Sequence, residues 1–320
     1  MKNKILATIV AFGLVGSASA IDINDNLSIT GFIDGSYQNN ESDSATASTE
    51  DQSLGLDEVE IDFLFNVANV SGEIHVDNND REDNSFDIEQ AHFSYSLENG
   101  VNFTFGRFGS ALGFEREDPS GLYTFSRAYG DSNTSNTDHF NFGNVDAQTF
   151  DGVSIGYATE LFSISGAFVN KTSQQMDLND DDIDLELSII YTGFDNLTLG
   201  LGYYFDNAEV SADENDVLNI HASTTVGKLF LAAEYSEISN ETRDRDAYMI
   251  LADYDVSDKF GIAARVSSNE VSAGAMDYDK ITIAPNYSIT DSLGVIVEYS
   301  DVDYGASDED LLAVELTFTF

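Results

Sequence analysis

The sequence contains no cysteine and no tryptophan, and only two prolines among its 320 residues. Without cysteine, the chain cannot contain disulfide scaffolds, thiolate zinc sites or cysteine nucleophiles. Basic residues are also scarce, with 13 Lys and Arg against 58 Asp and Glu, which gives a formal net charge of −45. A chain this acidic repels a phosphate backbone, so we expect no nucleic-acid partner.

A long apolar run occurs only at the start of the chain. Two lysines precede the apolar stretch Ile5–Gly16, and the small residues Ala18–Ala20 follow it. The stretch is shorter than the roughly twenty residues that a membrane-spanning helix needs. Residues 1–20 are therefore predicted to be a cleaved secretory signal peptide, which leaves residues 21–320 as the exported protein.

After this leader, apolar residues alternate with polar or small ones, which is the period of a β-strand. In one segment Val59, Ile61 and Phe63 alternate with Glu58 and Glu60. In another, Phe86 and Ile88 are out of phase with Phe93, which predicts a β-bulge near Gln90. We expect about sixteen strands: 26–37, 56–67, 70–77, 86–97, 101–107, 148–158, 161–170, 182–192, 197–206, 216–226, 229–238, 246–255, 259–268, 277–289, 293–302 and 310–320.

The connections between these strands are alternately short and long. Ala68-Asn69 and Gly227-Lys228 are short, whereas Gln38–Gly55, Lys171–Asp181 and Phe108–Ala147 are long and polar. Aromatic residues also recur at both ends of the apolar face. A soluble β-sandwich requires neither feature, and both are typical of a barrel in the outer membrane. The predicted fold class is all-β: a transmembrane antiparallel β-barrel of about 16 strands, whose lumen is wide enough to hold water.

The inward phase of the predicted strands is rich in carboxylates, while Arg265 and Lys280 are its few strong bases. Rings of carboxylates in a narrow aqueous passage favour cations. The alternative is that these charges are only a solvated wall. The acidic residues predicted to line the pore are Glu58, Glu60, Asp62, Glu73, Asp77, Asp184 and Glu186.

The connection Phe108–Ala147 is much longer than the others and is rich in aromatic residues. A long segment without alternation in a compact protein usually has a function of its own. We expect it to fold into the lumen as a constriction loop, the alternative being an ordinary surface loop. The charged residues assigned to this constriction are Arg107, Glu115, Arg116, Glu117, Asp118 and Arg127.

Taken together, the leader, the alternating segments, the long third external loop and the terminal Phe320 resemble Gram-negative outer-membrane porins, including the OmpL-like porins. Gly106-Arg107 leading into Leu112–Glu115 is similar to the start of their constriction loop. The resemblance implies passive diffusion of small hydrophilic solutes, location in the cell outer membrane among its lipid and lipopolysaccharide, a homotrimer, and recognition of Phe320 by the barrel-assembly machinery. General porins often set arginines on the wall opposite an acidic loop. Here the wall from Glu58 to Asp77 is acidic, which speaks against an anion channel.

Other motifs carry less weight. Gly152–Gly156 matches G-x-S-x-G, but it lies inside a predicted strand, so we expect no enzyme. Residues 77–87 and 179–182 are dense in oxygen ligands without a known metal-loop spacing, so loosely held cations are expected rather than a defined metal site, and no cofactor. Two alternatives stay open: a substrate-specific channel, for example for a sugar, and a non-conducting barrel that acts as an adhesin or receptor.

Overall fold

A computed structural model describes residues 20–78, 85–115, 119–129, 149–170, 183–207, 216–239, 244–272 and 277–320. Within these ranges no helix is long and apolar enough to cross a membrane. The elements are β1 (Ile21–Asn24), β2 (Leu27–Ser44), β3 (Ser48–Val67), β4 (Val70–Asn78), β5 (Asp87–Ser96), β6 (Val101–Gly109), the short 3₁₀ helix η1 (Pro119–Gly121), β7 (Thr149–Ala158), β8 (Phe162–Asn170), β9 (Asp184–Phe194), β10 (Leu197–Phe205), β11 (Asp216–Val226), β12 (Leu229–Ser239), β13 (Arg245–Asp255), β14 (Phe260–Val271), β15 (Tyr278–Ser288), β16 (Leu293–Asp303) and β17 (Ser307–Thr319).

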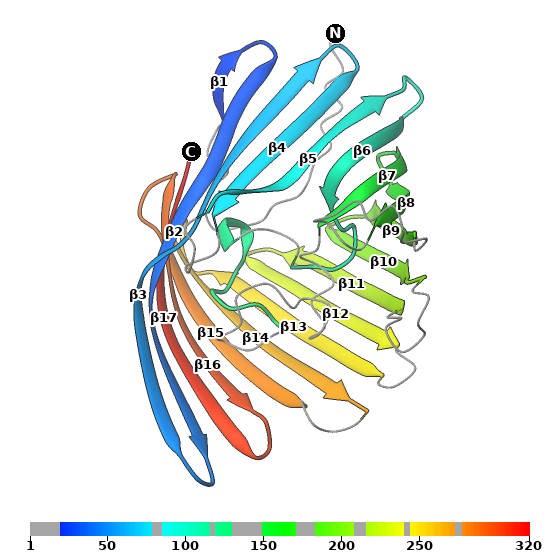
Figure 1. The fold of residues 1–320 in the computed structure, drawn as a ribbon. Coiled ribbons are helices and arrows are strands. Elements are labelled where there is room, and N and C mark those ends of the chain that lie inside the picture. Colours follow the sequence, from blue (N-terminus) through cyan, green and yellow to red (C-terminus); the bar gives the residue numbers. More distant parts are fainter. Residues whose placement is uncertain are drawn as a thin grey trace.

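The strands close into a ring (Figure 1). Each strand from β2 onward pairs antiparallel with the next one, and β17 pairs back onto β2, from Ser307 opposite Ser44 to Thr319 opposite Phe32. Sixteen strands therefore form a closed antiparallel barrel, as predicted. The short β1 was not predicted; it pairs with the start of β2, with Ile21 opposite Ile29.

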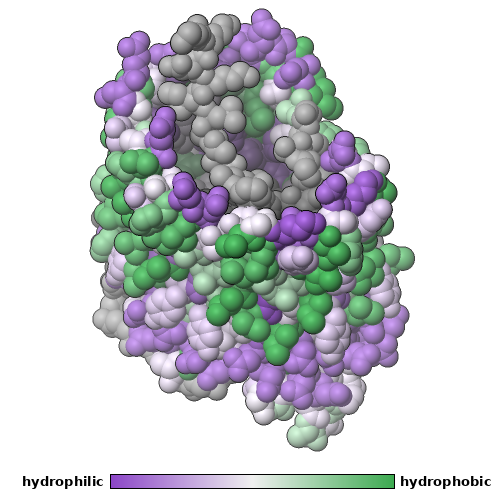
Figure 2. All heavy atoms as spheres, turned by 180° about the vertical axis from the view of Figure 1, so that it is seen from behind, coloured by the Kyte–Doolittle hydropathy of each residue, from purple (hydrophilic) through white to green (hydrophobic). Residues whose placement is uncertain are grey.

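The outer face of the barrel is apolar. Phe105 and Phe168 are each 60% exposed, and Tyr95, Tyr157 and Tyr254 are exposed toward the short-turn end. Figure 2 shows apolar side chains gathered in a belt across the middle of the molecule, with hydrophilic side chains above and below it. An outward apolar band between polar rims suits a bilayer, so the outward phase predicted from the alternation is confirmed.

Two strands are longer than the alternation indicated. The connection predicted over Gln38–Gly55 is mostly paired backbone, because β2 runs on to Ser44 and β3 begins at Ser48. The tip of this hairpin is exposed and polar on both faces, so hydrophobic periodicity could not reveal it. The predicted β-bulge is confirmed: Gln90 pairs with His75 and Ile88 with Val76, which leaves Glu89 as the extra residue.

Apolar side chains also cluster inside the barrel. Phe108 and Leu112 are buried with Phe150 of β7 and Tyr204 of β10. A second cluster joins Ala128 and Tyr129 to small and apolar side chains of the strands from β12 to β16, and Phe114, Tyr123 and Phe125 pack against it. The interior is thus partly filled by residues 110–115 and 119–129, which follow β6.

Candidate functional site

The inward phase of β3 and β4 forms an acidic wall, which we define as Glu58, Glu60, Asp62, Glu73 and Asp77. Glu58, Glu60 and Asp77 are buried, while the side chain of Glu73 is 42% exposed. The antiparallel register places these carboxylates close together, because Glu60 lies opposite Asp77 and Asp62 lies opposite His75. All five predicted residues therefore meet on one patch of the barrel interior.

His75 lies at the centre of the acidic wall. Its Nδ1 atom is 3.0 Å from Glu60 Oε1 and 3.2 Å from Asp62 Oδ1, and its Nε2 atom is 3.2 Å from Glu73 Oε2. One imidazole can carry at most one positive charge, and it faces three carboxylates. The patch thus keeps a strongly negative character.

The other two predicted acidic residues, Asp184 and Glu186 of β9, lie elsewhere on the ring. Asp184 accepts hydrogen bonds from the hydroxyl of Tyr204 and from the backbone N–H of Asn207, the latter at 2.9 Å. Glu186 accepts from Ser110 Oγ at 2.6 Å and from the N–H of Ala111 at 2.8 Å. Asp184 and Glu186 therefore bind the backbone at Asn207 and Ala111, respectively, and are not part of the acidic wall.

The residues after β6 contact the inward side of the barrel. We call residues 110–115 and 119–129 the inner segment. Besides Glu186, two more strand carboxylates accept hydrogen bonds from the inner segment. Glu234 of β12 accepts from the N–H of Phe114 at 2.7 Å, and Glu298 of β16 accepts from the N–H of Ser126 at 3.1 Å. Three strands far apart in the ring thus hold the inner segment through its own backbone.

The scarce lumen bases also contact the inner segment. Arg265 of β14 is buried, and its Nη1 atom donates to Glu115 Oε1 at 2.7 Å and to Thr124 Oγ1 at 2.8 Å. Lys280 of β15 donates to the backbone carbonyl of Arg127 at 3.1 Å. Glu115 also accepts from the N–H of Ala128 at 2.7 Å. The charge of Glu115 is therefore offset by Arg265, and both bases are engaged inside the barrel.

Arg107 does not belong with the inner segment, contrary to the sequence-based assignment. It lies in β6 on the alternation phase of the exposed Phe103 and Phe105, and its guanidinium pairs with Asp151 of β7 at 2.8 Å. The assignment followed chain position, whereas strand alternation decides the side. Arg127 donates to the carbonyl of Glu115. Arg116, Glu117 and Asp118 lie outside the described residues.

Aromatic rings gather beside the inner segment. Tyr123 stacks on Phe230 of β12 with ring centroids 5.0 Å apart, and Phe114 stacks on the same ring at 6.1 Å. Burial raises the pKa of the Tyr123 hydroxyl, with a contribution from Asp253 and Asp255. Tyr123 therefore stays neutral and offers a hydroxyl beside flat apolar faces.

The serine in the G-x-S-x-G match lies in the middle of β7. Val153, Ile155 and Tyr157 on either side of it are exposed on the outer face. A nucleophile elbow needs a sharp turn between a strand and a helix, and β7 is continuous here. The match is therefore part of a membrane strand.

Several solved structures resemble this barrel at low sequence identity. The outer-membrane channel DcaP of Acinetobacter baumannii has a TM-score of 0.70 at 13% identity, covering 95% of this chain and 100% of that one. An anion-selective porin from Comamonas acidovorans has a TM-score of 0.66 at 12% identity, covering 92% and 99%. OmpT of Vibrio cholerae, in its trimer form, has a TM-score of 0.60 at 15% identity, covering 92% and 100%.

These likenesses extend to the fold alone, and no curated protein matches the chain in sequence. A family model described as "Gram-negative porin" matches residues 6–310, nearly the whole chain. Together with the closed barrel and its apolar belt, this match places the protein in the outer membrane. The chain belongs to the Gram-negative porins.

Proposed function

We propose that this porin lets small hydrophilic solutes and ions diffuse passively across the outer membrane, and that it prefers cations. One observation carries the preference: the acidic wall sets five carboxylates beside a single imidazole inside the barrel, while Arg265 and Lys280 donate to the inner segment. Carboxylates along a narrow aqueous passage attract cations and repel anions. A structural neighbour is described as anion-selective, so the barrel fold by itself does not predict a cation preference. The proposal therefore depends on the charged residues inside this barrel.

We propose further that residues 108–147 act as the constriction of this passage. The hydrogen bonds from the inner segment to Glu186, Glu234 and Glu298 support this role, because they keep polypeptide inside the ring. We assign Arg116, Glu117 and Asp118 to the constriction from the sequence alone. The passage then lies between the inner segment and the acidic wall.

The reversal potential across a planar bilayer with a KCl gradient tests the cation preference. We expect the wild type to favour potassium, and the variant Glu58→Gln, Glu60→Gln, Asp62→Asn to favour it less. A matched control removes three charges from the exposed hairpin, Glu41→Gln, Glu50→Gln and Asp51→Asn, and should change little. A wild-type channel that prefers chloride would refute the proposal, and a folded protein without conductance would indicate a structural barrel or receptor.

Assembly and partners form a separate part of the proposal. A structural neighbour is described as a trimer, which supports a homotrimer here. Phe320 follows β17 directly and is hydrogen-bonded to β2: its N–H donates to the carbonyl of Gly31 at 3.0 Å, and its carbonyl accepts from the N–H of Gly31 at 3.1 Å. We propose that Phe320 is recognised by the barrel-assembly machinery and that the outer face contacts lipid and lipopolysaccharide. Chemical cross-linking in detergent tests the trimer, and monomers alone would exclude it.

A substrate-specific channel is the second candidate. The half-buried rings of Phe114, Tyr123 and Phe230 favour it, because flat apolar faces beside a hydroxyl can stack on a sugar ring. Single-channel recordings with millimolar maltose or glucose distinguish the two functions. A specific channel shows substrate-dependent interruptions of the current that Phe230→Ala abolishes, whereas a general porin shows none.

A further inference from the structure

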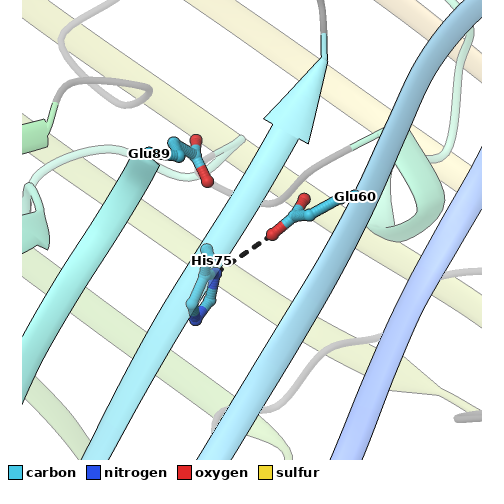
Figure 3. A group of neighbouring side chains, drawn as sticks. All are labelled: Glu60, His75 and Glu89. Carbon is cyan, nitrogen blue, oxygen red and sulfur yellow. Dashed lines mark hydrogen bonds and ion pairs between the residues drawn. The ribbon is translucent and has the colours of Figure 1, made fainter. Parts of the chain in front are cut away.

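Three neighbouring strands bring one imidazole and several carboxylates together on the acidic wall. Glu60 of β3, His75 of β4 and Glu89 of β5 each offer one ligand atom, and these atoms lie within 4.8 Å of one another. Figure 3 shows Glu60 and Glu89 on opposite sides of His75, each on an adjacent strand. A set of this kind, with nitrogen and oxygen donors from separate strands, matches the ligands of a bound transition metal.

The β-bulge in β5 contributes the third residue. The ladder between β4 and β5 skips Glu89, because Gln90 pairs with His75 and Ile88 pairs with Val76. An extra residue of this kind bends the strand and re-aims its side chain, and such bulges are frequent beside functional sites. Strict alternation would not have grouped Glu89 with His75, and the sequence prediction omitted it.

The distances around His75 resemble those between adjacent ligands of a metal ion. With metal–ligand bonds of about 2.1 Å, neighbouring ligand atoms lie roughly 3.0 to 3.4 Å apart in octahedral or tetrahedral geometry. His75 Nδ1 is 3.0 Å from Glu60 Oε1 and 3.2 Å from Asp62 Oδ1. A single proton on Nδ1 cannot point at both oxygens, whereas a metal ion in its place would bind both.

The second ring nitrogen supplies an independent observation. His75 Nε2 is 3.2 Å from Glu73 Oε2 on the same strand. Metal-binding histidines usually donate their other ring N–H to a carboxylate, which fixes the tautomer and strengthens the ligand. Glu73 holds His75 in this way, with Nδ1 directed toward Glu60.

We propose that Glu60, His75 and Glu89, with Asp62 as an additional oxygen donor, bind a divalent transition-metal ion of the zinc type inside the barrel. The imidazole favours this class over magnesium and calcium, which take oxygen ligands. The metal ion takes the place of the proton on His75 Nδ1, and the Nε2–H group of His75 still donates to the carboxylate of Glu73. A divalent ion at this place neutralises part of the acidic wall and lowers the cation preference of the passage.

Calorimetric titration of the detergent-solubilised protein with ZnCl₂ tests this proposal without any ion current, so its outcome is separate from that of the diffusion channel. We expect about one zinc ion per chain in 0.15 M salt, a concentration that screens loosely condensed ions. His75→Gln and Glu89→Gln should each weaken binding at least about tenfold, since even indirect partners of a metal contribute 10–100-fold. Glu89 is a half-buried residue in a β-bulge, so we expect the Glu89→Gln variant to fold like the wild type.

The matched control is His221→Gln, which removes another inward imidazole, from β11, whose Nδ1 atom lies 3.2 Å from Asn219 Oδ1. Its zinc affinity should equal that of the wild type. Cobalt provides a second readout, because the visible absorption bands of Co²⁺ change in position and intensity when protein ligands replace water, and His75→Gln should abolish this change. Equal affinities in all four proteins, or no zinc bound at 0.15 M salt, would overturn the proposal.

Discussion

Arg265 is a buried charged residue inside the barrel. Its side chain is buried and donates to Glu115, Thr124 and Ser126 of the inner segment. Removing one partner of a buried ion pair leaves the other charge unpaired in a poorly solvated place. The structure therefore makes Arg265 an anchor for the inner segment.

The variant Arg265→Gln is expected to destabilise the folded protein by about 3–5 kcal/mol, because Glu115 is left buried without its counter-charge. Urea unfolding in lipid vesicles measures this loss. Glu115→Gln in the same chain should restore part of it, so the double variant is more stable than Arg265→Gln alone. If the effects of the two substitutions simply add, the ion pair does not fix the inner segment.

The backbone conformation at position 106 requires glycine. Its φ is +130°, and a Cβ added there would lie 2.3 Å from the carbonyl oxygen of Ala91 on the neighbouring strand. Gly106→Ala should therefore lower the free energy of unfolding by about 1–3 kcal/mol. The control is Gly55→Ala in the exposed hairpin, where a Cβ meets nothing within 4 Å. Equal stability of the two variants in a urea titration would contradict this expectation.

Among the elements, the inner segment depends most on distant parts of the chain. Carboxylates of β9, β12 and β16 accept hydrogen bonds from its backbone at 2.7 to 3.1 Å. Each of these bonds joins residues that lie between 75 and 172 positions apart in the sequence. The closed ring therefore creates the places to which the inner segment attaches.

Removing those carboxylates should release the inner segment. For the variant Glu186→Ala, Glu234→Ala, Glu298→Ala we expect a larger and noisier single-channel conductance, since three backbone N–H groups lose their acceptors. Recording in 1 M KCl reduces the direct effect of the lost charges, because the Debye length is then about 3 Å. The control variant Glu41→Ala, Glu50→Ala, Glu160→Ala alters exposed carboxylates and should conduct like the wild type.

Alternation predicted most elements but not the contacts between them. The strands from β6 to β16 lie close to their predicted ranges because each has one face toward lipid and one toward the lumen. The tip of the β2–β3 hairpin has no apolar face, so its pairing left no periodic signal. Arg107 was misplaced because it was assigned by its position in the chain and not by the alternation of β6. Glu89 was missed because it is the extra residue of a β-bulge, where the alternation of inward and outward side chains is interrupted.

The charge of the whole molecule determines how the proposed selectivity depends on salt. The chain carries a formal charge of −45, and the inward bases Arg265 and Lys280 donate to the inner segment. We expect the cation preference to be strong in 0.01 M KCl and weak in 1 M KCl, because the Debye length falls from about 30 Å to about 3 Å. Reversal potentials at a constant concentration ratio measure this trend. A preference that does not change with salt would point to pore size or to a specific binding site instead.

The candidate site could be predicted from the sequence only in part. The five carboxylates of the acidic wall follow from the inward phase of two adjacent strands, and the structure brings three of them, Glu60, Asp62 and Glu73, together around His75. The anchoring roles of Glu234, Glu298 and Arg265 could not be predicted, because they depend on which wall residues the inner segment meets across the lumen. Periodicity along a strand contains no information about such contacts.

The pairing of β17 with β2 has a consequence for the order of assembly. Every other neighbouring pair in the ring joins consecutive strands, whereas this seam joins residues up to 290 positions apart, as between Thr30 and Phe320. Contacts between distant positions form slowly because the intervening chain must first be brought together. We therefore expect the hairpins to form early and the seam to close late. Until it closes, both edge strands are exposed, and this is the stage at which the nascent barrel is most prone to aggregation and most in need of a chaperone.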